Sequence, residues 1–166
     1  MEIDPAGKQV TDARTASVIA RPPLLFLAAL LIGFVLDRLL PPPLPITGSD
    51  LTHRIIGCLL ILIGLALGTA GIRNFSRAGT PVPTIEPTRV LVTSGIHGWT
   101  RNPIYLGMLL TYGGIGLAAQ SAWILILIFP LAITIRYGVI AREEAYLERL
   151  FGDAFRQYKT RVRRWL

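Results

Sequence analysis

The sequence predicts an all-α integral membrane protein with about four transmembrane helices and an amphipathic C-terminal helical segment on the cytoplasmic side. Of its 166 residues, 52% are hydrophobic and only 16% are charged, and the mean hydropathy is +0.53. The apolar residues gather in long runs, which is typical of membrane proteins rather than of soluble domains. After Ile140, apolar and charged residues instead alternate at three- and four-residue spacing, as in helices that lie on a membrane surface.

Four apolar runs predict the membrane spans, at residues 22–40, 55–72, 103–119 and 121–140. A helix needs about 20 residues to cross a hydrocarbon core of about 30 Å. Asp37 and Arg38 interrupt the first run, and a cleaved signal peptide is the alternative there, although the following DRLLPPPLP contains no small-residue cleavage site. We therefore expect a polar cytoplasmic leader at residues 1–21 and a single membrane domain at residues 22–166.

The distribution of basic residues predicts the orientation of these spans. Lys and Arg gather before the first run, in the loop between the second and third runs, and after the fourth run. The segment between the first and second runs holds only Arg38 and Arg54. Because cytoplasmic loops carry the excess of Lys and Arg, we expect both termini in the cytoplasm. The net charge of +7 then reflects topology and attraction to anionic lipid, and no nucleic-acid partner is expected.

The second apolar run carries two features of its own. Gly64 and Gly68 form a GxxxG step, which predicts close packing of this helix against a neighbour. Cys58 is the sole cysteine, so the chain has no intramolecular disulfide and no cysteine-rich metal site, and no metal is expected. The sequence leaves the oligomeric state open.

Two cytoplasmic segments flank the last pair of spans. The loop at residues 73–102 is too long for a simple connector and is rich in proline and threonine, so we expect an ordered cap on the membrane face, with disorder as the alternative. Residues 141–166 are expected to form amphipathic helices on the same face, divided at Gly152.

Polar residues are concentrated where the third run begins. Asn102 followed by Pro103 is typical of a helix start, with asparagine as the N-cap and proline at the first helical position. Arg101 beside this positive helix end predicts a site for an anion such as a carboxylate, which Tyr105 can also reach. The alternative is that Arg101 anchors the topology and Tyr105 is an interfacial aromatic residue.

A second polar cluster, Glu143 and Glu144, follows the fourth run. The short AAQSA turn makes the last two spans antiparallel neighbours, so this pair should lie near Arg101. Adjacent helical residues point about 100° apart, so at most one glutamate is expected to face the shared crevice. Arg136, Ile140 and Glu143 should share one helical face, and an arginine inside an apolar run is a candidate functional residue unless it only snorkels to the interface. A crevice with both charge signs suits a zwitterionic cofactor.

Two motifs at this separation resemble a known family. LVTSGIHGWTRNPIYLG at residues 91–107 and EEAYLERLFGDAFRQYKTRV at residues 143–162 resemble the isoprenylcysteine carboxyl methyltransferases and the related phospholipid methyltransferases, over about residues 73–165. The resemblance implies a membrane enzyme that transfers a methyl group from S-adenosylmethionine to a lipophilic acceptor, such as an isoprenylcysteine-type carboxylate or a related lipid. It leaves open which acceptor is used and whether an O, N or S atom receives the methyl group.

The resemblance also implies site residues by position. The residues expected around the cofactor are Val92, Thr93, Gly95, His97, Arg101, Asn102, Tyr105, Leu106, Glu143 and Glu144. Arg101, Arg136 and Glu144 are the catalytic candidates, with Arg136 expected to orient an acceptor carboxylate.

The chain departs from the family pattern at three adjacent positions, Ile96, His97 and Gly98, where proline, an aromatic residue and a basic residue are usual. GWTRNPIYLG also resembles the GWxRHPNYxGD of sterol reductases that use NADPH, but Ile104 and Met108 replace the asparagine and aspartate of that pattern. A reductase-like enzyme and a non-catalytic membrane protein are therefore the alternatives.

Overall fold

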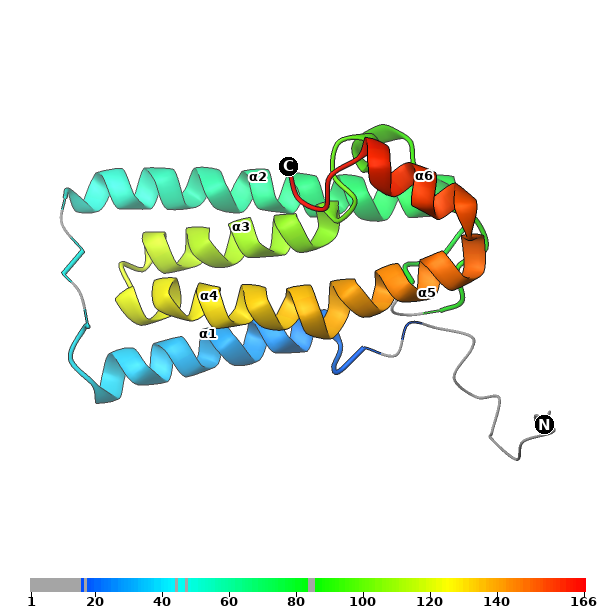
Figure 1. Ribbon diagram of the computed structural model, residues 1–166. Helices are drawn as coiled ribbons and strands as arrows, with labels where there is room; N and C mark the ends of the chain where they lie inside the picture. Colours follow the sequence, from blue (N-terminus) through cyan, green and yellow to red (C-terminus); the bar gives the residue numbers. More distant parts are fainter. Residues whose placement is uncertain (1–15, 17, 44, 47, 84–85) are drawn as a thin grey trace, which may run out of the picture.

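Four apolar helices lie side by side and form a bundle in the computed structural model (Figure 1), namely α1 (Pro22–Leu39), α2 (Asp50–Arg77), α3 (Pro103–Ala118) and α4 (Ala122–Ile135). At one end of the bundle α4 continues through the π turn η3 (Arg136–Ile140) into α5 (Ala141–Phe151), and α6 (Asp153–Arg161) then folds back. The structure describes residues 16, 18–43, 45–46, 48–83 and 86–166, and the regular elements within them are all helical. The predicted all-α class is confirmed.

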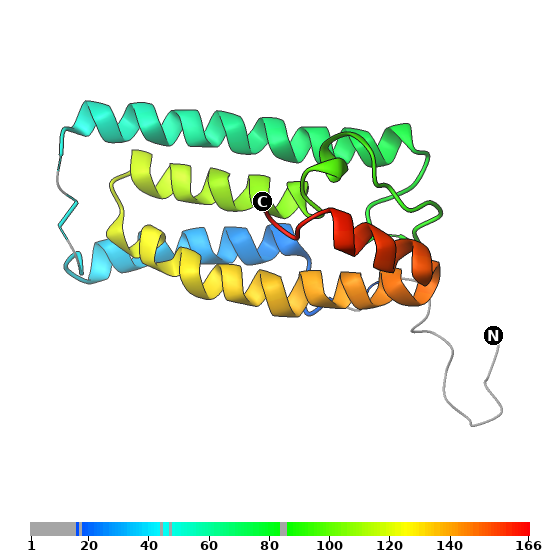
Figure 2. The ribbon, with the colours of Figure 1, turned by 45° about the horizontal axis from the view of Figure 1, so that its top comes forward.

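Three helical stretches are long and apolar enough to cross a membrane, at Pro22–Leu39, Asp50–Arg77 and Ala122–Phe151. The fourth apolar helix, α3, has 16 residues, which corresponds to about 24 Å at the usual rise per residue. It lies between α2 and α4 in both ribbon views (Figures 1 and 2).

The second helix extends beyond the apolar run at both ends. It begins at Asp50, where the Ser49 hydroxyl accepts a hydrogen bond from the Thr52 backbone N–H at 3.1 Å. It ends at Arg77, so the loop between α2 and α3 starts at Ala78, five residues later than the sequence predicts. Apolarity marks where a helix leaves hydrocarbon, whereas its backbone hydrogen bonds continue into the polar residues that follow. The loop contains the short 3₁₀ helix η2 (Gly95–Gly98), and the predicted leader at residues 1–21 lies mostly outside the described residues.

Glycines bring α2 and α3 into backbone contact. A Cβ added at Gly64 would lie 2.5 Å from the Gly107 carbonyl oxygen, and one added at Gly114 would lie 2.7 Å from that of Gly57. Gly64 therefore packs as the GxxxG step predicts. The Gly68 backbone also lies against α3, because a Cβ added at Gly107 would be 2.7 Å from its nitrogen, but a Cβ added at Gly68 itself would meet nothing within 4 Å.

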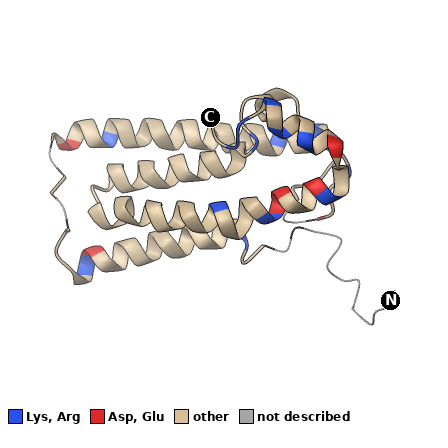
Figure 3. Ribbon diagram, viewed as in Figure 1, with Lys and Arg blue, Asp and Glu red and all other residues tan. Residues whose placement is uncertain are grey.

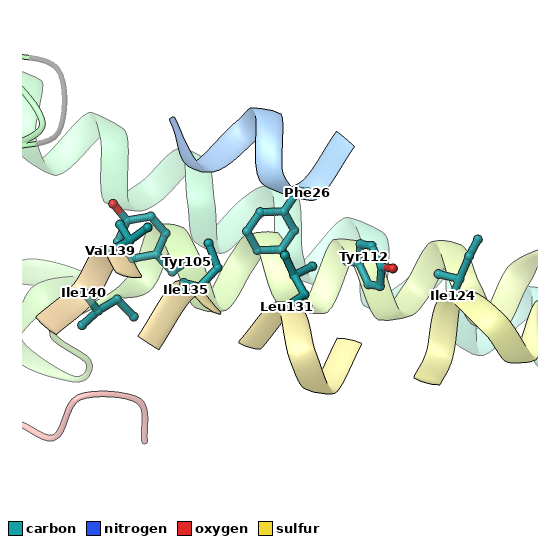
Figure 4. Close-up of a cluster of buried hydrophobic side chains, with 8 residues drawn as sticks. All are labelled: Phe26, Tyr105, Tyr112, Ile124, Leu131, Ile135, Val139 and Ile140. Carbon is teal, nitrogen blue, oxygen red and sulfur yellow. The ribbon is translucent and has the colours of Figure 1, made fainter. Parts of the chain in front are cut away.

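The main core lies among α1, α3 and α4 (Figure 4), with the buried side chains Phe26, Tyr105, Tyr112, Ile124, Leu131, Ile135, Val139 and Ile140. Gly33 of α1 leaves room for the Ile124 side chain, which fixes the seam between α1 and α4. Large apolar side chains on the outer faces of α1 and α2 are exposed, as expected for surfaces that contact lipid.

The π turn η3 changes which residues face the protein. Arg136 is exposed and its guanidinium carbon lies 5.3 Å from the centre of the Tyr137 ring, whereas Ile140 and Glu143 are buried. The predicted shared face of Arg136, Ile140 and Glu143 is therefore wrong. A π turn inserts a residue relative to an α-helix and so shifts the following face. Gly152, with φ of 51°, separates α5 from α6 as expected.

Candidate functional site

The loop after α2, the start of α3, and helices α5 and α6 meet at one end of the bundle (Figure 1). A cavity lies among them. Its apolar walls include Val82, Val92, Leu147 and Phe155. Six polar or charged side chains also line it, namely Thr88, His97, Arg101, Asn102, Glu143 and Glu144. The predicted meeting of the two motifs at one crevice is therefore seen in the structure.

A buried ionic network joins α5 to the chain on either side of the cavity. Glu144 accepts hydrogen bonds from Arg101 Nη2 at 3.0 Å and from Arg164 at 3.0 and 2.6 Å. Arg101 Nη1 donates to the carbonyl oxygens of Lys159 (3.1 Å) and Val162 (2.6 Å). The terminal nitrogens of Arg101 are thus engaged by the protein, while its Nε is buried without a hydrogen-bond partner among the described residues.

Glu143, the other glutamate of the cavity, bonds to α3 and not to the arginines. The Tyr105 hydroxyl donates to Glu143 Oε1 at 2.7 Å, and both side chains are buried. Both glutamates line the cavity, so the expectation that at most one would do so is wrong. The two glutamates therefore bond to different parts of the chain: α3 supplies the partner of Glu143, and Arg101 and Arg164 supply those of Glu144.

Asn102 occupies the N-cap position of α3 and Pro103 the first helical position, as predicted, but the Asn102 side chain makes no capping hydrogen bond. Its Nδ2 donates instead to the Arg164 carbonyl oxygen at 3.0 Å. The Thr100 hydroxyl donates to the same oxygen at 3.1 Å. The Asn102 side chain, which the sequence predicts to cap α3, thus bonds to the C-terminal segment instead.

His97, a departure from the family pattern, anchors the loop to α2. Its Nδ1 lies 3.0 Å from Asn74 Nδ2, which also donates to the Ser94 carbonyl at 2.6 Å. Because a carbonyl only accepts, the amide orientation is fixed and Nδ1 is the acceptor. The ring packs edge-on against Phe75, and the His97 carbonyl accepts from the Tyr158 hydroxyl at 2.6 Å. Burial lowers the pKa of His97 to about 4, so the imidazole is neutral at neutral pH.

Thr88 is a cavity residue that the motifs do not mark. Its backbone N–H donates to the Tyr146 hydroxyl at 3.1 Å, which ties the loop to α5. Its own hydroxyl is buried without a hydrogen-bond partner among the described residues. Buried polar atoms are normally paired, and Thr88 Oγ1 and Arg101 Nε are two unpaired atoms, among the described residues, on side chains that line the cavity.

The predicted cofactor residues divide into two groups. Those that line the cavity are Val92, His97, Arg101, Asn102, Tyr105, Glu143 and Glu144. Thr93, Gly95 and Leu106 do not line it, and Gly95 faces a separate hollow beside Arg73 on α2. Arg136 also lies outside the cavity, and its predicted action on an acceptor stays a prediction.

Sequence reasoning missed several residues that build the site. Arg164 lies in a basic C-terminal run that was assigned wholly to topology. Asn74 gave a weak signal, as a polar residue directly after an apolar run. Thr88 and Tyr146 gave no signal, because their contact joins positions 58 residues apart.

Comparisons with known proteins agree with this architecture. A family model described as phospholipid methyltransferase matches residues 52–154, which is more than half of the chain. Protein-S-isoprenylcysteine O-methyltransferase of Saccharomyces cerevisiae is 30% identical over 144 residues, covering 77% of this chain and 56% of the yeast protein. The protein of the same name in Schizosaccharomyces pombe is 34% identical over 74 residues, or 44% of this chain and 31% of that protein.

A bacterial protein of Haemophilus influenzae, described as uncharacterized, is 52% identical over 50 residues, which are 30% of this chain and 76% of that protein. The chain thus spans little more than half of the S. cerevisiae relative and about a third of the S. pombe relative. No solved structure matches the chain.

An apolar helical bundle with a cavity at one end, lined by both apolar and polar side chains, defines an integral membrane protein. Within this class, the chain belongs to the phospholipid methyltransferase family, because the family model covers most of the bundle and both sides of the cavity. The predicted family and the predicted enzyme class, a membrane methyltransferase, are confirmed.

Proposed function

We propose that the protein transfers a methyl group from S-adenosylmethionine to the carboxylate of a lipophilic, isoprenylcysteine-type acceptor at the cytoplasmic face of the membrane. The observation that carries this proposal is the cavity, which is lined by two glutamates and by two residues with unpaired buried polar atoms, Thr88 and Arg101. The names of the two yeast relatives support a carboxylate acceptor.

The cavity residues fit this cofactor. Its amino acid portion carries an ammonium and a carboxylate, and the cavity offers Glu143 for the former and Arg101 Nε for the latter. The Thr88 hydroxyl is a further group that can bond the cofactor. Val92 and Phe155 give apolar surface that suits a purine ring.

The protein's own part in the reaction is positioning. When bound, S-adenosylmethionine supplies an electrophilic methyl group, which a carboxylate oxygen accepts to give a methyl ester and S-adenosylhomocysteine. Carboxylates are ionised at neutral pH, so the protein needs no general base for this acceptor. Orientation and exclusion of water by the cavity walls can lower such a barrier by up to about 7–11 kcal/mol. An amine or thiol acceptor would in addition require a group that takes its proton.

The charge distribution supports a cytoplasmic cavity. Lys and Arg gather at the end of the bundle that holds α5 and α6 (Figure 3). Arg38 lies in the last turn of α1 and Arg54 near the start of α2, toward the opposite end. The start of α1 lies at the cavity end as well (Figure 1). Under the positive-inside rule this end faces the cytoplasm, with the protein in a bacterial inner membrane.

Ligand stabilisation followed by methyl transfer tests this function. Protein in nanodiscs should gain thermal stability from S-adenosylhomocysteine and not from NADPH. It should then transfer radiolabelled methyl from S-adenosylmethionine to S-farnesylcysteine, and mild base should release the label, as expected of a methyl ester. Stabilisation by NADPH alone would support the reductase alternative, and a response to neither ligand would contradict both enzyme functions.

A further inference from the structure

A separate hollow lies on the outer face of α2, toward the end of the bundle that holds the cavity. We refer to it as the α2 hollow; its volume is about 480 Å³, and Gly95 and Ile96 of η2 form one of its walls. Arg73, which also lines it, follows Gly64 by nine positions, or about two and a half helical turns. Because Gly64 packs against α3, this part of the hollow faces away from α3.

The lining of the α2 hollow changes from apolar to cationic along the helix. Leu65, Ala66 and Ala70 line it within the apolar run, and Arg73 and Arg77 line it where that run ends. Positions 65 and 77 are about 18 Å apart at the rise of an α-helix. The hollow therefore extends from the depth of the hydrocarbon core into the headgroup region. A phospholipid has the same order of apolar and polar parts.

The two arginines carry charges that no acidic side chain of the protein balances. Arg73 and Arg77 are exposed, and neither makes an ion pair among the described residues. The described lining of the hollow contains no carboxylate. Arg164, by contrast, is paired with Glu144. Since residues four positions apart lie on one face of a helix, both guanidinium groups can reach a single phosphate.

The wall formed by η2 is held against α2. Asn74 Nδ2 donates to the Ser94 carbonyl oxygen at 2.6 Å, and a Cβ added at Gly95 would lie 2.8 Å from Asn74 Oδ1. The hollow is therefore built by two elements in contact and not by one helix alone. Trp99 directly follows η2 and is 80% exposed. Exposed tryptophan is typical of the membrane interface, so this wall lies at the depth of lipid headgroups.

We propose that the α2 hollow binds one anionic phospholipid, whose phosphate lies at Arg73 and Arg77. One acyl chain then follows the apolar part of the hollow. Two unpaired cations complement an anionic headgroup, whereas a zwitterionic headgroup would bring an ammonium group toward them. The site is independent of the proposed function, because the hollow shares no lining residue with the cavity.

Native mass spectrometry measures the lipid preference. The full-length protein is released from micelles that contain equal amounts of phosphatidylglycerol and phosphatidylcholine. We expect a single retained phosphatidylglycerol, with an about thirtyfold preference over phosphatidylcholine, which corresponds to about 1 kcal/mol for each arginine. Equal retention of the two lipids would overturn the proposal.

A matched pair of double variants tests the two arginines. Arg73→Gln with Arg77→Gln should remove the preference for phosphatidylglycerol. Arg149→Gln with Arg161→Gln removes the same charge from exposed positions outside the hollow, and should keep the preference. Equal losses in both double variants would show a general attraction between a basic surface and anionic lipid, and no specific site. Circular dichroism checks that both proteins keep their helices.

Photolabelling locates the lipid without any substitution. Wild-type protein in phosphatidylcholine nanodiscs is illuminated with a trace of phosphatidylglycerol that carries a diazirine on an acyl carbon near the headgroup. We expect label on residues 65–77 that excess phosphatidylglycerol displaces. Label spread over all lipid-facing helices, or label that is not displaced, would overturn the proposal even if the variants failed to fold. Equal displacement by glycerol 3-phosphate would show a site for a soluble phosphate and would overturn the lipid as its occupant.

Discussion

At the scale of single residues, the sequence located the site but not the bonds within it. Arg101, Tyr105, Glu143 and Glu144 were predicted to meet, and they do. The start of a helix and the position of a motif are set by residues that are adjacent in the sequence, so the sequence alone can predict them. Arg164 could not be found in this way, because its bond to Glu144 depends on how the last residues return over the cavity.

A substitution at Thr88 tests whether a single atom, the side-chain hydroxyl oxygen, contributes to cofactor binding. Thr88→Val removes a hydroxyl that has no partner among the described residues and keeps the shape of the side chain. We expect unfolding stability to stay within about 0.5 kcal/mol, while S-adenosylhomocysteine binds about fivefold more weakly through loss of one hydrogen bond. Calorimetric titration measures the affinity, with exposed Thr160→Val as the control. Unchanged affinity would exclude Thr88 as a cofactor ligand.

His97 predicts a pH dependence of stability. Burial lowers its pKa from 6.5 to about 4, so the unfolded chain binds more protons than the folded protein between these values. Stability should therefore be complete above pH 6.5 and fall as the pH drops toward 4, by at most about 1.4 kcal/mol per pH unit.

Thermal unfolding of the wild type and His97→Gln between pH 4 and pH 7.5 measures this effect. The glutamine carbonyl can still accept from Asn74 but does not titrate. The difference in stability between the two proteins should shrink or reverse toward pH 4. A constant difference over the whole range would show that His97 does not contribute to the pH dependence.

At the scale of helices, the apolar runs predicted the number of apolar helices and roughly where they lie. They did not predict which side of each helix faces the interior of the bundle. The π turn at Arg136–Ile140 is invisible to a search for α-helical periodicity, and it moves Arg136 away from the face of Glu143. The GxxxG step predicted a close contact but could not show that Gly64 is packed and Gly68 open, because this depends on the position of α1 and α3.

Alanine substitutions at these two glycines test the contact between α2 and α3. A Cβ at position 64 would lie 2.5 Å from the Gly107 carbonyl oxygen, so Gly64→Ala should lower the free energy of unfolding by about 1–3 kcal/mol. Gly68→Ala meets open space and should be neutral or stabilise by up to about 1 kcal/mol, through the better helix propensity of alanine. Unfolding in detergent compares the two variants, and equal effects would contradict the packing described for this seam.

At the scale of the whole molecule, the C-terminal segment, residues 162–166, joins the start of α3 to Glu144 of α5. The Arg101 backbone N–H donates to the Arg163 carbonyl oxygen at 3.0 Å, and the Asn102 side chain bonds the next carbonyl. This segment therefore holds the start of α3 and α5 together across the cavity. Composition could predict a membrane bundle. It could not predict that the C-terminal segment bonds across the cavity, because a basic terminal run is equally typical of a segment that anchors a protein at the membrane surface.

Arg164→Gln tests whether this closure is needed for cofactor binding. Glu144 raises the pKa of Arg164 by hydrogen bonding to it. The substitution leaves Arg101 as the one cation among the described residues that pairs with Glu144, whose side chain is 10% exposed. Removing one partner of a buried charged group typically costs about 1–3 kcal/mol, so we expect lower thermal stability and at least tenfold weaker binding of S-adenosylhomocysteine. Arg161→Gln, which removes an exposed charge three residues earlier, should change neither. If both variants bind S-adenosylhomocysteine like the wild type, the C-terminal segment only anchors the protein to the membrane surface and does not shape the cavity.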